Sequence, residues 1–327
     1  MLPVAVDAMG GDNAPESIVA GALRAREERG IPVVLVGQPD VIGDTGGIEV
    51  IEASEVIAMD ADPGSSVRTM KDSSLVRAAE AVRDGRASAM VSAGNTGATM
   101  ASALLRTGRI KGVPRPAIAT AIPGPVGTPT VLLDSGANAE CRPEWLVPFG
   151  HMGALFARTR FGVERPRVGL LSIGEEAGKG SPFVKEAFEH LEKVDWNAHG
   201  ADFIGNVEGR DLMGTDVDVV VTDGFTGNVA LKTLEGGARN IINALVEAFG
   251  STPEAQAASE QLLPALLPLY KRFDADTYGG AMLLGTKGVC IISHGSSGEE
   301  AMVNAISVAA EMVECDLVGK ITEAVNA

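Results

Sequence analysis

Seven turns rich in glycine and small polar residues follow apolar segments of this chain and hold most of its candidate chemistry. They are DAMGGD (7–12), SAGNTGA (92–98), DSGAN (134–138), SIGEEAGKG (172–180), GNVEGRD (205–211), TDGFTGN (222–228) and HGSS (294–297). Glycine lets a ligand approach the backbone, and Ser, Thr and Asn side chains donate hydrogen bonds. Because a helix that starts after such a turn presents unpaired N–H groups, the pattern is typical of anion sites, phosphate above all.

Two of these turns, SAGNTGA and TDGFTGN, place Gly, Asn and Thr at the entry of a predicted helix. For any single turn, the alternative is that small polar residues only cap the helix. Several such turns together favour a phosphate cradle. The residues predicted to form it are Gly10, Gly11, Gly94, Asn95, Thr96, Gly227 and Asn228.

His294 is the best candidate for proton transfer, because it follows the apolar segment 289–293 and an imidazole can exchange protons near pH 7. The alternative is a histidine at a strand end that only binds backbone. Lys179 and Asn138, or a backbone N–H, are candidates for stabilising an oxyanion, and Lys232 is a further candidate cation. His190 and Asp195 have H-x-x-x-x-D spacing, but His190 lies on a face that looks solvated.

Several familiar motifs are missing from the sequence. It contains no G-x-x-x-x-G-K-[ST], G-x-G-x-x-G, G-x-S-x-G or H-E-x-x-H. This argues against a P-loop ATPase, a standard dinucleotide site, an α/β hydrolase and a zincin. Glu175, Glu176, Asp134 and Asp223 are candidate metal ligands, but carboxylate spacing alone is weak evidence for a site, so we expect neither a metal nor a cofactor.

Composition indicates a folded, acidic protein. Of 327 residues, 45% are hydrophobic and 21% charged, and the net charge of −16 disfavours nucleic acid as a partner. Cys141, Cys290 and Cys315 are far apart, which fits a reducing compartment. The first residues lack a basic segment and no apolar run reaches 18 residues, so we expect a cytoplasmic protein without a signal peptide or membrane span.

Short β-branched runs alternate with glycine-rich turns and amphipathic stretches, a pattern that predicts an α/β fold with a largely parallel sheet. Predicted strands are 2–6, 33–36, 49–52, 88–92, 117–122, 131–134, 168–173, 203–204, 217–222 and 289–293. Predicted helices are 15–29, 74–84, 96–106, 143–160, 182–193, 226–249 and 299–325. We expect one α/β domain over 1–327, with all seven turns at one edge of the sheet, forming a single cleft.

An excursion at about 251–278 interrupts this pattern with prolines. The excursion is predicted to be an apolar helical region broken by prolines. Its segment QLLPALLPLYKRFD (261–274) is expected to be kinked by Pro264 and Pro268, and it is too short to span a bilayer. It is predicted to lie on a membrane or to line an acyl groove, with an interior helix or a dimer contact as alternatives. The residues concerned are Leu262, Leu263, Leu266, Leu267 and Leu269.

The motifs AVDAMGGDNAPE, VSAGNTGA, LLDSGAN, GLLSIGEEAGKG, FIGNVEGRDL, VVVTDGFTGNVALKTLEG and GGAMLLGTKGVCIISHGSS resemble, in order and spacing, the acyl-carrier-protein-dependent phosphate acyltransferases of bacterial phospholipid synthesis. The resemblance runs from about residue 4 to residue 310. It implies a cytoplasmic homodimer that transfers a long fatty acyl chain from acyl carrier protein to inorganic phosphate. It also implies transient contact with the inner membrane face and delivery of acyl phosphate to a glycerol-3-phosphate acyltransferase.

The resemblance also implies a three-layer α/β/α fold like that of isocitrate and isopropylmalate dehydrogenases. The chain departs from the family pattern at Ser135, Ser172 and Met282. Docking of an acidic carrier to this acidic chain requires a local basic patch. The first candidate patch is Arg106, Arg109, Lys111 and Arg115, and the second is Arg158, Arg160, Arg165 and Arg167.

Two other functions stay open from the sequence. One is an NAD- and metal-dependent hydroxy-acid dehydrogenase of the isopropylmalate type, although the chain lacks a convincing set of substrate-binding arginines and metal carboxylates. The other is a membrane-docking scaffold without catalysis, which would rely on segment 261–274.

Overall fold

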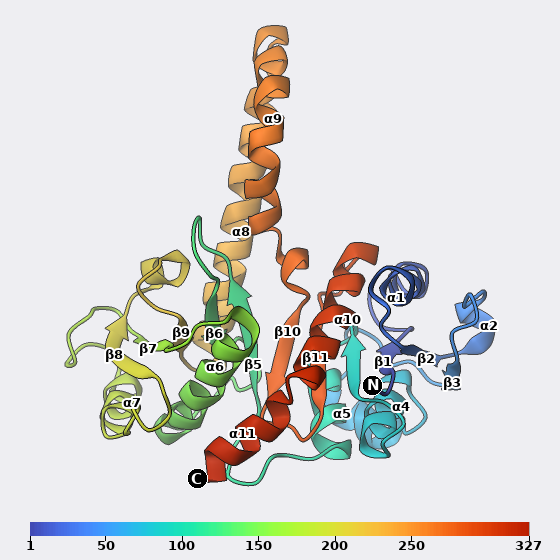
Figure 1. Ribbon diagram of the computed structural model, residues 1–327, viewed down its shortest axis with the longest axis horizontal. Coiled ribbons are helices and arrows are strands. Elements are labelled where there is room, and N and C mark those ends of the chain that lie inside the picture. Colours follow the sequence, from blue (N-terminus) through green and yellow to red (C-terminus); the bar gives the residue numbers. More distant parts are fainter. Residues whose placement is uncertain (327) are drawn as a thin grey trace.

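A single mixed sheet of eleven strands organises the computed structural model, which describes residues 1–326 (Figure 1). The strands are β1 (Val4–Asp7), β2 (Val33–Gly37), β3 (Val50–Glu52), β4 (Ala89–Ser92), β5 (Ala117–Ile122), β6 (Thr130–Leu133), β7 (Arg167–Leu171), β8 (Asp202–Val207), β9 (Val219–Val221), β10 (Ala281–Leu284) and β11 (Val289–Ile292). Every predicted strand overlaps one of these. Only β10, a four-residue segment between glycines, has no predicted counterpart.

Helices and turns connect these strands. The α-helices are α1 (Glu16–Arg29), α2 (Pro39–Ile42), α3 (Pro63–Thr69), α4 (Ser74–Arg83), α5 (Thr96–Arg106), α6 (Leu146–Phe161), α7 (Pro182–Glu192), α8 (Gly224–Phe249), α9 (Pro253–Phe273), α10 (Glu299–Glu314) and α11 (Leu317–Asn326), and the 3-10 helices are η1 (Pro143–Trp145), η2 (Gly209–Met213) and η3 (Ala275–Tyr278). The predicted single helix over 299–325 is wrong, because Asp316 adopts a positive φ of 49° between α10 and α11.

The strand order is β3-β2-β1-β4-β11-β10-β5-β6-β9-β7-β8. The pairs β10–β11, β10–β5 and β5–β6 are antiparallel, and all other pairs are parallel. Two parallel halves therefore run in opposite directions on either side of the centre. The prediction that all seven turns lie at one edge is wrong, because the turns after β1, β4 and β11 leave the sheet in one direction and those after β6 to β9 in the other.

The strands are staggered, so the two sets of turns lie closer together than the opposite directions of the two halves of the sheet suggest. Leu133, the last residue of β6, pairs with Ala119, which pairs in turn with Met282 beside Ile291 of β11. The turn after β6 thus begins at about the level where β11 ends. Because β9 pairs with β6 in register up to Leu133, the turn after β9 begins at the same level.

Side chains along each strand alternate between the two faces of the sheet, so the core is divided between these faces. Val4 and Val6 pack in the cluster that includes α1, α6 and α10, whereas Ala5 packs with α4 and α5 on the other face. On that second face, a separate cluster under α8 contains Leu132, Val220 and Leu231. Two groups of helices therefore cover the second face, α4 and α5 in one place and α8 in another. The strip over β5 and β10 lies between them.

Helices α8 and α9 form a hairpin that projects from the rest of the molecule (Figure 1). Pro264 and Pro268 lie inside a continuous α9, so the prediction that prolines break this segment is wrong. Each proline removes only one backbone donor, and the contact of α9 with α8 supports the segment. No helix formed by residues 1–326 is long and apolar enough to cross a membrane.

Candidate active site

A pocket of about 180 Å³ lies on the second face of the sheet, between the N-terminus of α5 and the side of α8. Its floor is formed by β5 and the start of β10, and its walls by residues from the turns after β4, β6, β9 and β11. The polar residues that line it are Thr96, Thr120, Ser135, Asn228, Lys232, Glu235, Tyr278, Ser293 and His294. It therefore collects members of both sets of turns.

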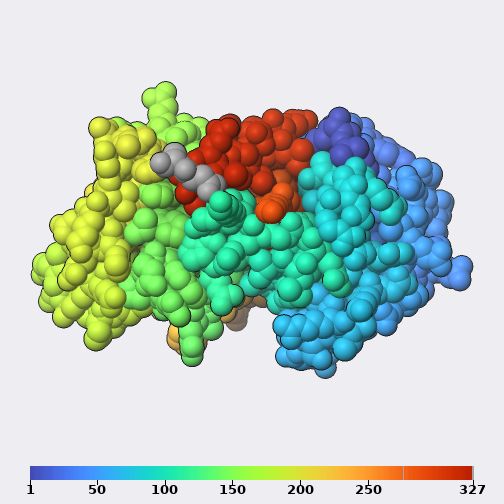
Figure 2. All heavy atoms as spheres, turned by 90° about the horizontal axis from the view of Figure 1, so that it is seen from below, coloured from blue at the N-terminus to red at the C-terminus, as the bar shows by residue number. Residues whose placement is uncertain are grey.

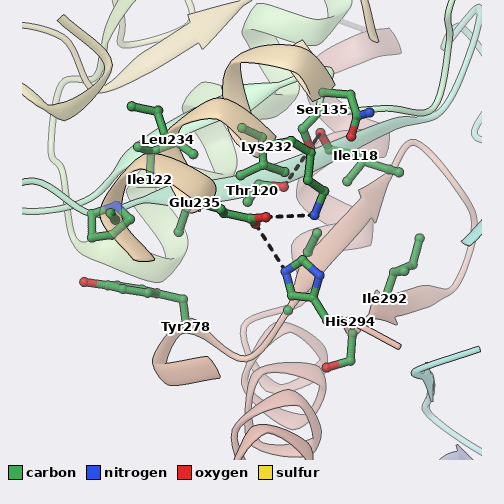
Figure 3. A pocket seen from close by; sticks show the side chains of 18 of the residues that line it. Ile118, Thr120, Ile122, Ser135, Lys232, Leu234, Glu235, Tyr278, Ile292 and His294 are labelled. Carbon is green, nitrogen blue, oxygen red and sulfur yellow. Dashed lines mark hydrogen bonds and ion pairs between the residues drawn. The ribbon is translucent and has the colours of Figure 1, made fainter. Parts of the chain in front are cut away.

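Glu235 contacts both His294 and Lys232 in the pocket. Its Oε1 lies 3.3 Å from His294 Nε2, and its Oε2 accepts a hydrogen bond of 2.8 Å from Lys232 Nζ. Figure 3 shows Lys232 and Glu235 extending from α8 toward His294. Burial by itself raises the pKa of Glu235, but the hydrogen bonds from His294 and Lys232 lower it by more, so the carboxylate is ionised at neutral pH.

Two hydroxyl groups meet on the floor of the pocket. Thr120 Oγ1 and Ser135 Oγ are 2.6 Å apart, and Ser135 Oγ also lies 3.1 Å from the carbonyl oxygen of Ile118 (Figure 3). Each hydroxyl has one proton, so either Ser135 donates to Ile118 O and Thr120 donates to Ser135, or Ser135 donates to Thr120 and leaves the Thr120 proton for a ligand. Thr96 faces the same space from the first turn of α5, where backbone N–H groups lack intrahelical partners.

The predicted phosphate-binding glycines lie in two separate places. A Cβ on Gly10 would lie 2.7 Å from the backbone nitrogen of Gly94, and Gly11 lies beside the carbonyl oxygen of Gly295. The turns after β1, β4 and β11 therefore pack on one another at the wall of the pocket that Thr96 and Gly295 form. Asp12 N donates to Gly295 O at 2.7 Å, which fixes the turn that carries His294.

Asp134 organises the other set of turns. Its carboxylate accepts hydrogen bonds from the backbone N–H groups of Ile118, Gly136, Ala137 and Asn138. A Cβ on Gly227 would collide with the carbonyl oxygen of Asp134, so only glycine lets the first turn of α8 approach this closely. This contact places Asn228 at the pocket.

The structure brings together His294, Thr96 and Asn228 from the predicted set, with Gly94 and Gly227 immediately behind them. Three other predicted side chains either bind other groups or lie apart from this pocket. The amide of Asn95 caps α5 and donates to the carbonyl oxygens of Met59 and Ala61. Asn138 Nδ2 donates to Pro116 O and Asp134 Oδ2. Lys179 lies on the turn after β7 and does not line the pocket.

Glu235, Thr120 and Ser135 are pocket residues that the sequence did not single out for chemistry. A signal was present for Glu235, because Asn228, Lys232 and Glu235 recur at helical spacing and therefore share one face of α8. No such signal existed for Thr120, which lies inside an apolar strand. Ser135 stood out only as a departure from the family pattern.

An apolar groove between α8 and α9 continues from the pocket. Met213, Leu234, Ala238 and Phe273 line both spaces, so the two are contiguous. The groove, of about 710 Å³, is lined by side chains that are almost entirely aliphatic or aromatic. Of the predicted leucines, Leu263, Leu266, Leu267 and Leu269 line it, whereas Leu262 is 54% exposed and lies outside it.

The two predicted basic patches differ in the exposure and contacts of their side chains. Arg109, Lys111 and Arg115 are exposed on the loop before β5. The teal segment that contains this loop lies on the side of the molecule seen in Figure 2, away from the α8–α9 hairpin. Arg106 is instead half-buried against Glu80, with an N–O separation of 3.6 Å.

The second patch is largely neutralised or held by internal contacts. Arg165 and Arg167 form ion pairs with Asp202 and Asp218. Arg158 donates to the carbonyl oxygens of His199 and Gly200, and Arg160 pairs with Glu311. Among residues 1–326, no three His, Cys, Asp or Glu side chains are grouped so that they could hold a metal ion.

Comparison with solved structures supports the fold. A branched-chain phosphotransacylase from Enterococcus faecalis V583 superposes with a TM-score of 0.60 at 15% identity, covering 96% of this chain and 99% of that one. A phosphotransacetylase from Streptococcus pyogenes has a TM-score of 0.63 at 16% identity, with 96% and 94% covered. A 4-hydroxythreonine-4-phosphate dehydrogenase from Klebsiella pneumoniae has a TM-score of 0.54 at 14% identity, with 96% and 100% covered. The three-layer α/β/α architecture is thus shared with both transferases and a dehydrogenase.

Sequence comparison is more specific. A phosphate acyltransferase of Desulforudis audaxviator (strain MP104C) is 48% identical over 322 residues, covering 97% of this chain and 94% of the relative. One of Leptospira biflexa serovar Patoc is 46% identical over 330 residues, with 98% and 96% covered. The family model described as "Fatty acid synthesis protein" matches residues 2–320, and the chain belongs to this family.

Proposed function

We propose that this protein is a phosphate acyltransferase that moves a fatty acyl group from a carrier thioester to inorganic phosphate. The observation that carries the proposal is the junction of two spaces, a polar pocket containing Lys232 and His294 and an apolar groove that shares walls with it. The first fits a phosphate and the second fits an aliphatic chain. Relatives named phosphate acyltransferase at 46–48% identity support the same activity.

Phosphate itself is the nucleophile, which agrees with the absence of a nucleophile elbow. One of its oxygens attacks the thioester carbon and forms a C–O bond, and collapse of the tetrahedral intermediate breaks the C–S bond. The proton of HPO₄²⁻ ends on the departing sulfur, so no further reactant is needed. His294 is placed to carry this proton, while Lys232 and the hydroxyls of Thr96 and Thr120 hold the phosphate.

The acyl tail extends into the groove between α8 and α9. Burial of each methylene is worth about 0.8 kcal/mol, so groove length favours long chains. Leu263, Leu266 and Leu267 of α9 face residues such as Ile242 and Leu245 of α8 across this groove. Because many of these side chains are exposed, the hairpin is also the part of the surface best suited to contact a membrane.

Carrier protein is proposed to dock on Arg109, Lys111 and Arg115. These residues precede β5, and Ile118, Thr120 and Ile122 along that strand line the pocket.

The remaining proposals rest on family membership. They are a single α/β domain related to isocitrate and isopropylmalate dehydrogenases, a cytoplasmic homodimer with transient membrane contact, and transfer of acyl phosphate to a glycerol-3-phosphate acyltransferase. The rival NAD- and metal-dependent dehydrogenase is disfavoured, because no three His, Cys, Asp or Glu side chains among residues 1–326 are grouped so that they could hold its metal ion.

A direct assay tests the activity. Purified protein is incubated with palmitoyl carrier protein and phosphate, without nucleotide or metal, and release of carrier thiol is measured. We expect phosphate-dependent release, which His294→Ala slows by about 10²–10⁴-fold if proton transfer limits the rate. Reduction of NAD with a hydroxy acid, or no release of thiol at any phosphate concentration, would refute the proposal. Phosphate-dependent release of thiol from soluble acyl carrier in the absence of any membrane would refute the scaffold alternative.

A further inference from the structure

The environment of His294 is more specific than a histidine at a strand end requires. Its turn is fixed by the hydrogen bonds from Asp12 N to Gly295 O and from Ser297 N to His294 O, the latter 3.0 Å long. Ser293 Oγ and Ser297 Oγ, 2.9 Å apart, close the turn further. Rotation of the imidazole about its side-chain bonds is then the main freedom left.

Glu235 restricts that freedom. With Oε1 3.3 Å from Nε2, its carboxylate accepts the Nε2 proton, so the neutral imidazole keeps its lone pair on Nδ1. An accepting carboxylate also stabilises the imidazolium form that carries a proton between phosphate and sulfur. Lys232, 2.8 Å from the other carboxylate oxygen, holds Glu235 in this orientation.

We infer that Glu235 is the positioning residue of this active site, fixing the tautomer and orientation of His294 while Lys232 secures it. This inference rests on the proposed function, since it assigns a role within the same proton transfer. Glu235 does not touch the reacting atoms. It is half-buried, with 23% of its side chain exposed, so its interaction with the imidazole is stronger than that of a fully solvated ion pair.

Other charged and titratable groups face the imidazole and affect any pH dependence of the reaction rate. On α8 these are Glu235 and Lys232, and on η3 they are Asp276 and Tyr278. Burial, followed by repulsion from Asp274, raises the pKa of Asp276, while nearby His294 lowers it. Of these groups, only Glu235 has a carboxylate oxygen recorded within ion-pair distance of His294.

The test is a double-mutant cycle on phosphate-dependent thiol release, with Glu235→Gln, His294→Ala and the double variant. We expect Glu235→Gln to lower kcat at least tenfold, with the KM for phosphate changed less than threefold, and to have no further effect in the His294→Ala background. Glu235→Asp should recover part of the rate.

Two controls separate this role from others. Glu247→Gln removes a carboxylate from the exposed distal part of α8 and should leave all parameters unchanged. In a Lys232→Met background, Glu235→Gln should still lower kcat, because its action runs through His294. An equal loss of kcat with and without His294, or a Glu235→Gln variant as active as Glu247→Gln, would overturn the inference. If the wild type releases no thiol with phosphate, the proposed function fails instead.

Discussion

Thr120 Oγ1 lies 2.6 Å from Ser135 Oγ, which joins the middle of β5 to the turn after β6 on the pocket floor. These two residues belong to an antiparallel hairpin, and their contact exists only because β6 runs back along β5. When Ser135 donates to Thr120, the Thr120 hydroxyl is the donor that this apolar floor offers to a ligand. It is thus part of the proposed phosphate site.

This contact predicts a graded effect of substitutions. Thr120→Val keeps the shape and removes the hydroxyl, and loss of a neutral hydrogen bond costs about 0.5–1.5 kcal/mol. We expect the KM for phosphate to rise by roughly 2- to 10-fold, with Thr120→Ser close to the wild type. The KM for the acyl carrier serves as the internal control. A rise in carrier KM with an unchanged phosphate KM would remove Thr120 from the phosphate site.

The contact between Gly227 and Asp134 predicts opposite effects for two alanine substitutions in one helix. In Gly227→Ala the new Cβ meets a backbone carbonyl that cannot rotate away, so we expect a loss of about 1–3 kcal/mol in unfolding free energy. Gly236→Ala enters open space in the same helix and should gain about 0.5–1 kcal/mol. Urea denaturation measures both. Equal stabilities for the two variants would contradict the close packing.

Because Asn95 caps α5, we expect its substitution to lower the stability of the protein rather than to weaken substrate binding directly. Asn95→Ala removes the acceptor for Ala98 N and leaves the carbonyl oxygens of Met59 and Ala61 without their donor. We expect a loss of about 1–3 kcal/mol, measured as a lower Tm. Asn95→Asp keeps the cap acceptor and should recover part of it. An Asn95→Ala variant with normal Tm but a raised phosphate KM would instead restore the predicted cradle role.

The buried Asp7 predicts a pH dependence of stability. Burial raises the pKa of its carboxyl above the ordinary value, against the lowering effect of hydrogen bonds from Ser92 and the backbone. The unfolded chain therefore loses this proton at lower pH than the folded protein does. The contribution of Asp7 is fully present below about pH 4, the unperturbed aspartate pKa, and is lost as pH rises through the folded value.

Asp7→Asn isolates this effect, since asparagine does not titrate. The unfolding free energy of the wild type minus that of the variant should fall as pH rises from about 4 and then level off. Urea denaturation at a series of pH values gives this difference. A difference that rises with pH would show that Asp7 is stabilised as the anion.

The exposed patch before β5 predicts a salt-dependent carrier interaction. Arg115→Glu should raise the KM for acyl carrier protein severalfold at low salt and leave the KM for phosphate unchanged, because exposed charges are screened above about 0.1 M salt. Lys193→Glu, at an exposed position after α7, makes the same charge change elsewhere and is the control. A carrier KM that is insensitive to Arg115→Glu and to salt would exclude this docking site.

The amino-acid sequence by itself determined the local features of this protein. Apolar β-branched runs specified the strands that were predicted, because burial on both faces leaves a continuous hydrophobic signal. Glycine, Asn and Thr at helix entries specified turns able to approach an anion. The exposed leucines of α9 were equally evident, although their prolines wrongly suggested a broken helix.

Only the tertiary structure decided which of those features meet. The direction of each strand depends on long-range pairing that no local pattern records. The unpredicted β10 runs antiparallel to both β11 and β5, and the second half of the sheet is reversed where β6 runs back along β5. That reversal sets His294, at the end of β11, against Glu235 on the helix after β9. The same packing commits Asn95 and Asn138 to backbone carbonyls, because their amides satisfy buried acceptors that would otherwise lack partners.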